Sequence, residues 1–241
     1  MTLYLNEMLK LRTVRSTYYL LLIAQAIIVV GVSGAFASGN APDDVVVVRG
    51  VAHVGLTSLF ALVLGVLSMA GEYRHRTITD TFLSSPRRGS VVAAKLGVAS
   101  TLGVLFGIVG SFTALASSWI WAVFKDIPFA WSSVPLWQTL AGAVVWNALF
   151  AAIGVGIGAL IRNVAGAVAA ALAWLALVEG LVGQLLGDSL ARWLPFQAGS
   201  ALGRLPLNES LAQWTGGVVL VAYSLVFAIL AVTVSVRRDV A

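Results

Sequence analysis

Cysteine is absent from the 241-residue chain, and His53 and His75 are its only histidines. The first absence excludes a disulfide framework, a thiolate metal site and a cysteine nucleophile. The scarcity of histidine argues against a histidine-rich metal centre. We therefore expect no metal ion bound by this chain, and its cellular compartment has to be inferred from features other than thiols.

Charged residues are also scarce. Asp, Glu, Lys and Arg make up 10% of the chain, whereas a soluble domain carries about 25%. Hydrophobic residues make up 59% and the mean hydropathy is +0.95, so lipid is the expected solvent for most of the chain. The net charge of +5 does not indicate nucleic-acid binding, because the basic residues lie at the ends of apolar segments. One membrane domain over residues 1–241 is predicted.

Six apolar segments are long enough for transmembrane helices, which need roughly 20 residues. They are too long for the strands of a membrane barrel, so the chain is predicted to be an all-α integral membrane protein. Glu179 is the only acidic or basic residue within them. The predicted transmembrane spans are residues 18–37, 51–70, 98–123, 138–161, 166–186 and 215–236.

The basic residues predict the orientation, since Lys and Arg of short loops are retained on the cytoplasmic side. With six spans and both termini in the cytoplasm, eleven of the 15 Lys and Arg residues lie inside. The inverted topology would place most of them outside. We expect a multi-pass protein of a bacterial plasma membrane. The outer segments keep Arg49, Lys125, Arg192 and Arg204.

Residues 1–17 place Leu5, Met8 and Leu9 on one helical face, as an interfacial helix bound to membrane lipid would. A short polar tail with scattered leucines is the alternative. The first span could also be a cleaved signal peptide. That interpretation is disfavoured because the apolar run over residues 18–36 exceeds the roughly 7–15 residues of a signal h-region.

The cytoplasmic connection over residues 71–97 is the most informative segment. Links between bundled helices usually take roughly 2–8 residues, whereas 24 residues run from Gly71 to Ala94. A short helix here would place Ile78, Phe82 and Leu83 outside the membrane as an exposed apolar knob, and Pro86 would end it. An apolar centre with a charged rim suits a soluble protein partner, and a loop held by anionic lipid is the alternative. The basic rim comprises Arg74, Arg76, Arg87 and Arg88.

This segment resembles the permeases of type-2 ABC exporters. Residues 71–78 read Gly-Glu-Tyr-Arg-His-Arg-Thr-Ile, residues 82–88 read Phe-Leu-Ser-Ser-Pro-Arg-Arg, and Ala-Ala-Lys follows at 93–95. The resemblance extends to six spans, cytoplasmic termini and a long outer segment before the last span. It implies that Thr77 to Leu83 is a coupling helix that docks into a separate ATPase, with Glu72 and Arg74 bracing its base. Arg76, where such permeases often have a small residue, departs from the pattern.

The resemblance also implies the partners. Two copies of a cytoplasmic ABC ATPase would bind the ATP and Mg²⁺, because this chain has no phosphate-binding loop of the Gly-x-x-x-x-Gly-Lys-Ser/Thr type. A second copy of the permease, or a sister subunit, would complete twelve spans. We expect no catalytic residue and no cofactor in this chain, which would move a hydrophobic or amphipathic substrate outward.

A substrate path is suggested by Phe60, Trp174 and Glu179, because the second and fifth spans line the path in the resembling family. A charged group within a span is by default a functional candidate, although Glu179 could instead be hydrogen-bonded to a neighbouring helix. The outer segment over residues 187–214 is too apolar for a solvated loop. It is expected to form re-entrant or interfacial helices that close an outer gate, or an aromatic belt that only anchors the bundle.

Two other functions are alternatives to export. An intramembrane enzyme would need a nucleophile with a base, or paired carboxylates, at membrane depth, and none is visible. An ion-coupled secondary transporter would carry several buried acids or an internal repeat, and only Glu179 is present. The glycine pairs spaced by four residues, such as Gly154 and Gly158, favour helix packing within one subunit over a subunit interface.

Overall fold

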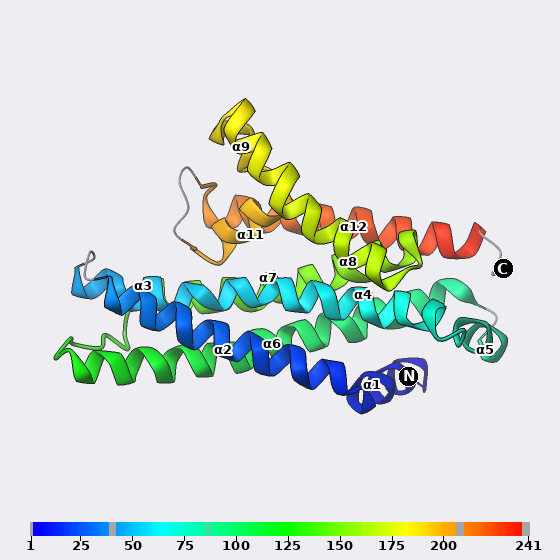
Figure 1. Cartoon of the computed structure of the whole chain (residues 1–241), viewed down its shortest axis with the longest axis horizontal. Coiled ribbons are helices and arrows are strands. Elements are labelled where there is room, and N and C mark those ends of the chain that lie inside the picture. The colour runs from blue at the N-terminus through cyan, green and yellow to red at the C-terminus, as the bar shows by residue number, and fades with distance from the viewer. Residues whose placement is uncertain (1, 39–41, 86, 206–209, 238–241) are drawn as a thin grey trace.

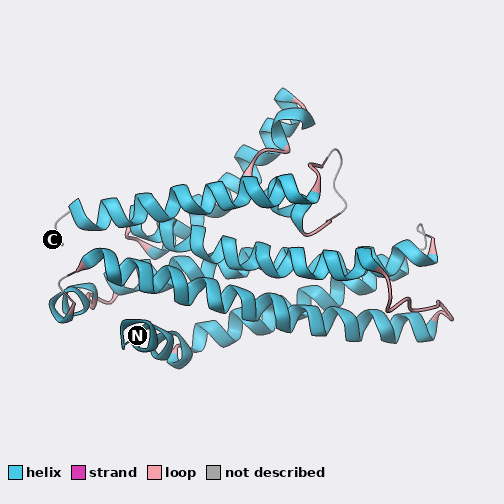
Figure 2. Ribbon diagram, turned by 180° about the vertical axis from the view of Figure 1, so that it is seen from behind, coloured by secondary structure: helices cyan, strands magenta, loops and turns pink. Residues whose placement is uncertain are grey.

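The computed structural model describes residues 2–38, 42–85, 87–205 and 210–237, and they form helices and no strand (Figures 1 and 2). The all-α prediction is therefore confirmed for this part of the chain. The elements are α1 (Thr2–Thr13), α2 (Arg15–Ala37), α3 (Asp43–Ala52), η1 (His53–Thr57), α4 (Ser58–Arg74), α5 (Ile78–Ser84), α6 (Arg88–Phe124), α7 (Val134–Ile161), α8 (Val164–Ala173), η2 (Trp174–Glu179), α9 (Gly180–Leu186), α10 (Asp188–Ala191), α11 (Pro195–Leu202) and α12 (Gln213–Arg237).

Five helical segments are long and apolar enough to cross a membrane, which fits a multi-pass membrane protein. They agree with five of the six predicted spans. The remaining predicted span, residues 166–186, is helical throughout but is divided among α8, the π-helix η2 and α9, and it leans away from the bundle in Figure 1. The five segments are residues 15–37, 45–74, 88–124, 134–161 and 213–236.

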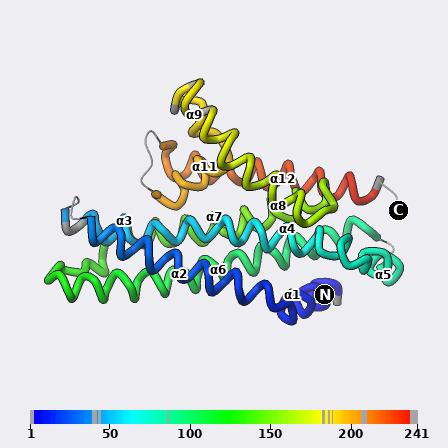
Figure 3. The backbone as a smooth tube through the Cα atoms, in the orientation of Figure 1, coloured from blue at the N-terminus to red at the C-terminus, as the bar shows by residue number. Residues whose placement is uncertain are grey.

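The bundle has one end at which several elements gather. In Figure 3, α1, α5 and the C-terminal end of α12 lie at the same end. Residues 1–17 and the segment after α4, which are both predicted to be cytoplasmic, thus lie at the same end of the bundle. The side of the membrane that this end faces stays a prediction. The N-terminal helix itself is present as α1, and it meets α2 at a sharp bend around Val14.

The predicted 71–97 loop is mostly helical. The α4 helix continues to Arg74 and α6 already begins at Arg88, ten residues before the predicted span. Among the described residues of the segment, only 75–77, 85 and 87 lie outside helices; Pro86 lies outside the described residues. The sequence does not predict this extension, because residues 88–97 include Arg88, Ser90 and Lys95 and are too polar for a predicted span.

Glycines allow the helices of the bundle to pack closely. A Cβ atom at Gly154 of α7 would overlap the carbonyl oxygen of Leu62 of α4, and one at Gly103 of α6 would overlap the backbone of α7 at Asn147. These contacts are made within one chain, as predicted for Gly154. Backbones that approach so closely leave room for no side chain.

The described part of residues 187–214, the predicted outer segment, contributes one buried helix. Pro195, Ala198 and Gly199 of α11 are buried, and α11 packs against α7 and α12. The indole ring of Trp146, on α7, lies against Gly199 so closely that a Cβ atom there would overlap it. Part of residues 187–214 is thus packed into the bundle, whereas Trp193 and Trp214 remain exposed as an anchoring belt would require.

Candidate functional site

A cluster of four charged side chains joins α1, α4 and α6 at the end of the bundle that carries α5. Lys95 Nζ lies 2.5 Å from Glu7 Oε2 and 2.8 Å from Glu72 Oε1. Lys10 Nζ lies 2.6 Å from Glu7 Oε1 and 2.8 Å from the same Glu72 oxygen. We call Glu7, Lys10, Glu72 and Lys95 the charged quartet. Its two positive and two negative charges balance.

The quartet is mostly buried. Lys95 is 1% exposed, Glu7 5% and Glu72 9%. Charges removed from water are tolerated only when they are paired and their remaining hydrogen-bonding groups are satisfied. Lys95 meets this condition by donating also to the carbonyl oxygen of Ser68 at 3.2 Å. Burial acts to lower the pKa of Lys10, but its hydrogen bonds to Glu7 and Glu72 outweigh burial and raise it.

The quartet is linked to α5. Lys10 donates to Thr81 Oγ1 at 3.3 Å, and the backbone N–H of Thr77, just before α5, donates to the carbonyl oxygen of Glu72 at 3.0 Å. One short helix is therefore tied through Lys10 and Glu72 to α1, α4 and α6. A displacement of α5 would strain its hydrogen bonds to Lys10 and Glu72, which are paired with Glu7 and Lys95.

The α5 helix agrees in position with the helix predicted over Thr77 to Leu83, within one residue at each end. Its coupling role stays a prediction. The exposed apolar knob was predicted wrongly in two of its three residues. Ile78 and Phe82 are buried against Leu3, Tyr73 and Val91, because the α6 extension provides an apolar wall beside them. The Arg88 guanidinium also lies 5.3 Å from the centre of the Phe82 ring.

Leu83 is the apolar residue that α5 presents outward, at 77% exposure. The predicted rim is present in part: Arg74, Arg76 and Arg87 are exposed, whereas Arg88 is engaged with Phe82. Arg76 adopts a left-handed backbone with φ of 56°, a conformation that favours glycine. A glycine would adopt this conformation without strain, and nothing in the described contacts explains why Arg76 occupies the position.

Glu179 has a structural role in the described contacts. Its carboxylate accepts hydrogen bonds from the backbone N–H of Phe196 at 3.0 Å and of Gln197 at 3.2 Å, in the first turn of α11. An acidic side chain satisfies free N–H groups at a helix start. Its burial in η2 and this capping agree with the alternative in which Glu179 bonds to a neighbouring helix.

The residues of the predicted substrate path are not brought together. Phe60 packs with Leu64 and Phe106 toward α2 and α6. Trp174 instead lines an apolar cavity of about 150 Å³ with Phe150, between α7 and η2. The spacing of these residues along the two spans could not predict their separation, because the direction in which each side chain points depends on the helices that pack against its span. Among the described residues, therefore, Phe60 does not share the cavity that Trp174 lines.

The sequence predictions do not include Glu7 or Lys10, and they include Lys95 only as part of the resemblance at residues 93–95. A signal was available: Glu7 is the only acidic residue before Asp43 and precedes Lys10 by three positions, a spacing that pairs side chains on a helix. Among the described residues, no group of His, Asp and Glu could hold a metal ion. Comparison with protein families and with curated proteins finds no match for the chain.

Proposed function

We propose that this chain is the membrane-spanning permease subunit of an ABC exporter, driven by a separate ATPase that docks on α5. The observation that carries the proposal is the position of α5, a short helix outside the long helices that is linked through Lys10 and Glu72 to α1, α4 and α6. The proposal also draws on the sequence resemblance of residues 71–95 to type-2 ABC permeases. No bond chemistry is assigned to this chain.

The docking surface is the outward face of α5. Leu83 forms an apolar centre, Asp80 and Ser84 are exposed beside it, and Arg74, Arg76 and Arg87 lie around the helix. Protein interfaces combine a desolvated apolar centre with a polar rim. Ile78 and Phe82 hold α5 on the bundle, so that a force applied to Leu83 is delivered to α4 and α6.

In this mechanism two ATPase subunits bind ATP and Mg²⁺, and their closure moves α5 in each of two permease subunits. The charged quartet transmits the movement, because buried ion pairs resist separation. The spans then tilt between inward-facing and outward-facing arrangements, as rigid-body switching permits. The substrate class that fits an apolar bundle is hydrophobic or amphipathic.

The test is co-purification of the Leu83→Glu variant with the ABC ATPase encoded beside the gene. Leu83→Glu places a carboxylate in the apolar centre without disturbing the core, whereas Phe82→Glu would bury an unpaired charge and unfold α5. Leu185→Glu is the matched control, since Leu185 is 76% exposed and lies in α9, far from α5.

We expect the ATPase to co-purify with the unaltered chain and with Leu185→Glu, and to be lost from Leu83→Glu. All three proteins should elute as single species in detergent. Loss from both variants, or retention by both, would remove the assignment of α5 as the docking element. Failure of the ATPase to bind the unaltered chain would remove the exporter assignment itself.

A further inference from the structure

A cavity of about 570 Å³ lies beside the charged quartet, between α1, α2 and α4. Ligand-binding clefts usually fall between about 300 and 1,000 Å³. One side of its wall is charged, through Lys10, Glu72 and Arg74, and the other is apolar, through Leu64 and Leu67. A wall of two such halves suits an amphiphile better than a wholly polar or wholly apolar ligand.

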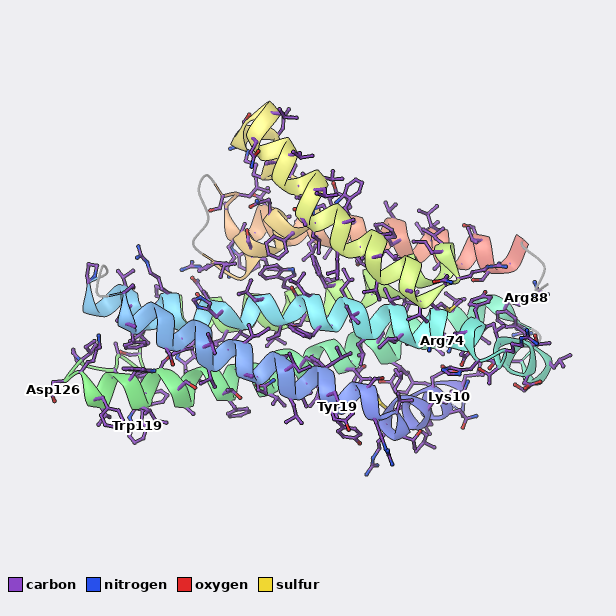
Figure 4. The ribbon with its side chains drawn as sticks, in the orientation of Figure 1. Lys10, Tyr19, Arg74, Arg88, Trp119 and Asp126 are labelled. Atoms are coloured by element: carbon purple, nitrogen blue, oxygen red, sulfur yellow. The ribbon has the colours of Figure 1, made fainter. Side chains whose placement is uncertain are left out.

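The cavity lies at the border between the charged end of the bundle and its apolar belt. Arg15 at the start of α2 is exposed, and Tyr18, Tyr19 and Leu22 follow as exposed residues on the same helix. Tyrosines gather at the level of lipid headgroups. Figure 4 shows Lys10 and Arg74 together at this end, with Tyr19 farther along α2. A phospholipid of the inner leaflet would meet the cavity at headgroup depth.

Glu72, which lines the cavity, has one buried acceptor oxygen without a hydrogen-bond partner. Glu72 Oε1 accepts from the ammonium groups of both Lys10 and Lys95, whereas Glu72 Oε2 is buried and has no hydrogen-bond partner. Neither lysine has an N–H to spare, since an ammonium has three donors. Lys10 donates to Glu7, Glu72 and Thr81, and Lys95 to Glu7, Glu72 and Ser68. Leaving a carboxylate oxygen unpaired is costly, so a donor from a ligand would stabilise it.

Arg74 supplies the complementary charge. It is exposed in the same wall, and a guanidinium recognises a phosphate through two parallel N–H donors. We propose that this cavity binds one phospholipid with a primary-ammonium headgroup, of the phosphatidylethanolamine class. The ammonium donates to Glu72 Oε2, the phosphate accepts from Arg74, and the acyl chains leave along Leu64 and Leu67. This inference depends on the membrane location of the chain and not on the ATPase.

The test measures lipid retained by the purified protein, by native mass spectrometry, after reconstitution into vesicles. One set of vesicles contains phosphatidylethanolamine and phosphatidylglycerol. The other contains phosphatidylcholine in place of phosphatidylethanolamine, because a quaternary ammonium has no N–H to donate. Arg74→Gln removes the phosphate partner, and Leu67→Trp fills the apolar side. Arg76→Gln is the matched control, because Arg76 is exposed two residues away and does not line the cavity.

We expect one phosphatidylethanolamine per chain in the unaltered protein and in Arg76→Gln, with retention lowered about tenfold in Arg74→Gln and Leu67→Trp. Phosphatidylcholine should be retained about tenfold less than phosphatidylethanolamine. Equal retention of the two, preferential retention of phosphatidylglycerol, undiminished retention by both cavity variants, or no lipid on the unaltered protein would each overturn the proposal. Circular dichroism confirms that the variants compared are folded.

Discussion

The Lys95 ammonium, on α6, lies 2.8 Å from Oε1 of Glu72, on α4, at a depth where Lys95 is 1% exposed. The same oxygen accepts from Lys10 of α1. The N-terminal helix is therefore joined to the long helices by paired charges as well as by apolar contacts. A buried pair of this kind contributes less than its Coulomb attraction suggests, because desolvation opposes it, but breaking it is costly.

Lys95→Met should destabilise the protein by about 3–5 kcal/mol, because it leaves Glu7 and Glu72 with one lysine instead of two. Thermal unfolding in detergent, followed by the fluorescence of the eight tryptophans, measures the change. Lys10→Met is the comparison. It should cost less, since the Lys10 side chain is 46% exposed and water can replace its contacts. An equal effect of the two substitutions would mean that burial does not control the strength of these pairs.

Gly154→Ala should destabilise the bundle by about 1–3 kcal/mol or more, because the added methyl group overlaps the backbone of Leu62 and neither helix can yield locally. Gly34→Ala is the control. Nothing lies within 4 Å of a Cβ atom at Gly34, so the substitution should be neutral or stabilising by up to about 1 kcal/mol through helix propensity. Similar melting temperatures for the two variants would contradict the close approach of α4 and α7.

Much of the architecture could be predicted from the sequence, because lipid imposes long apolar helices and places charges at their ends. The position of α5 was also predictable, since apolar residues one turn apart mark a helical face. The burial of Phe82 was not. It depends on the extension of α6 to Arg88, and the hydrophobicity of a short helix does not reveal whether a partner helix covers it.

The charged quartet could not be assembled from the sequence for a similar reason. Glu7 and Lys95 are 88 positions apart, and which lysine meets which carboxylate depends on how α1 folds back against α4 and α6. The role of Glu179 likewise depends on α11, which follows η2 in the chain but returns to place its first turn against the carboxylate. The charge of Glu179 within a predicted span marks it as a candidate functional residue. Only the packing of α11 against η2 shows that it caps a helix.

Arg76→Gly should stabilise the protein slightly, by up to about 1 kcal/mol. The left-handed conformation at Arg76 costs a residue with a Cβ atom about 1–2 kcal/mol, and the greater freedom of glycine in the unfolded chain offsets about half of this gain. Arg74→Gly, in the last turn of α4, should instead destabilise by about 0.5–1 kcal/mol. If Arg76→Gly lowers the melting temperature as much as Arg74→Gly does, the positive φ at Arg76 is not the native conformation.

Glu179→Ala should loosen α11, because the N–H groups of Phe196 and Gln197 lose the acceptor that caps them and a cap contributes about 0.5–2 kcal/mol. The absence of cysteine allows a direct measurement. Ser200, in α11, is fully buried, so a Ser200→Cys protein should react slowly with a membrane-permeant thiol reagent. Adding Glu179→Ala should accelerate the labelling about 2- to 30-fold, as the free energy of the cap implies. Glu179→Gln keeps one acceptor oxygen and should fall between them. A labelling rate that is the same in all three proteins would show that α11 is held by Trp146 and α12 alone, and that Glu179 has another task.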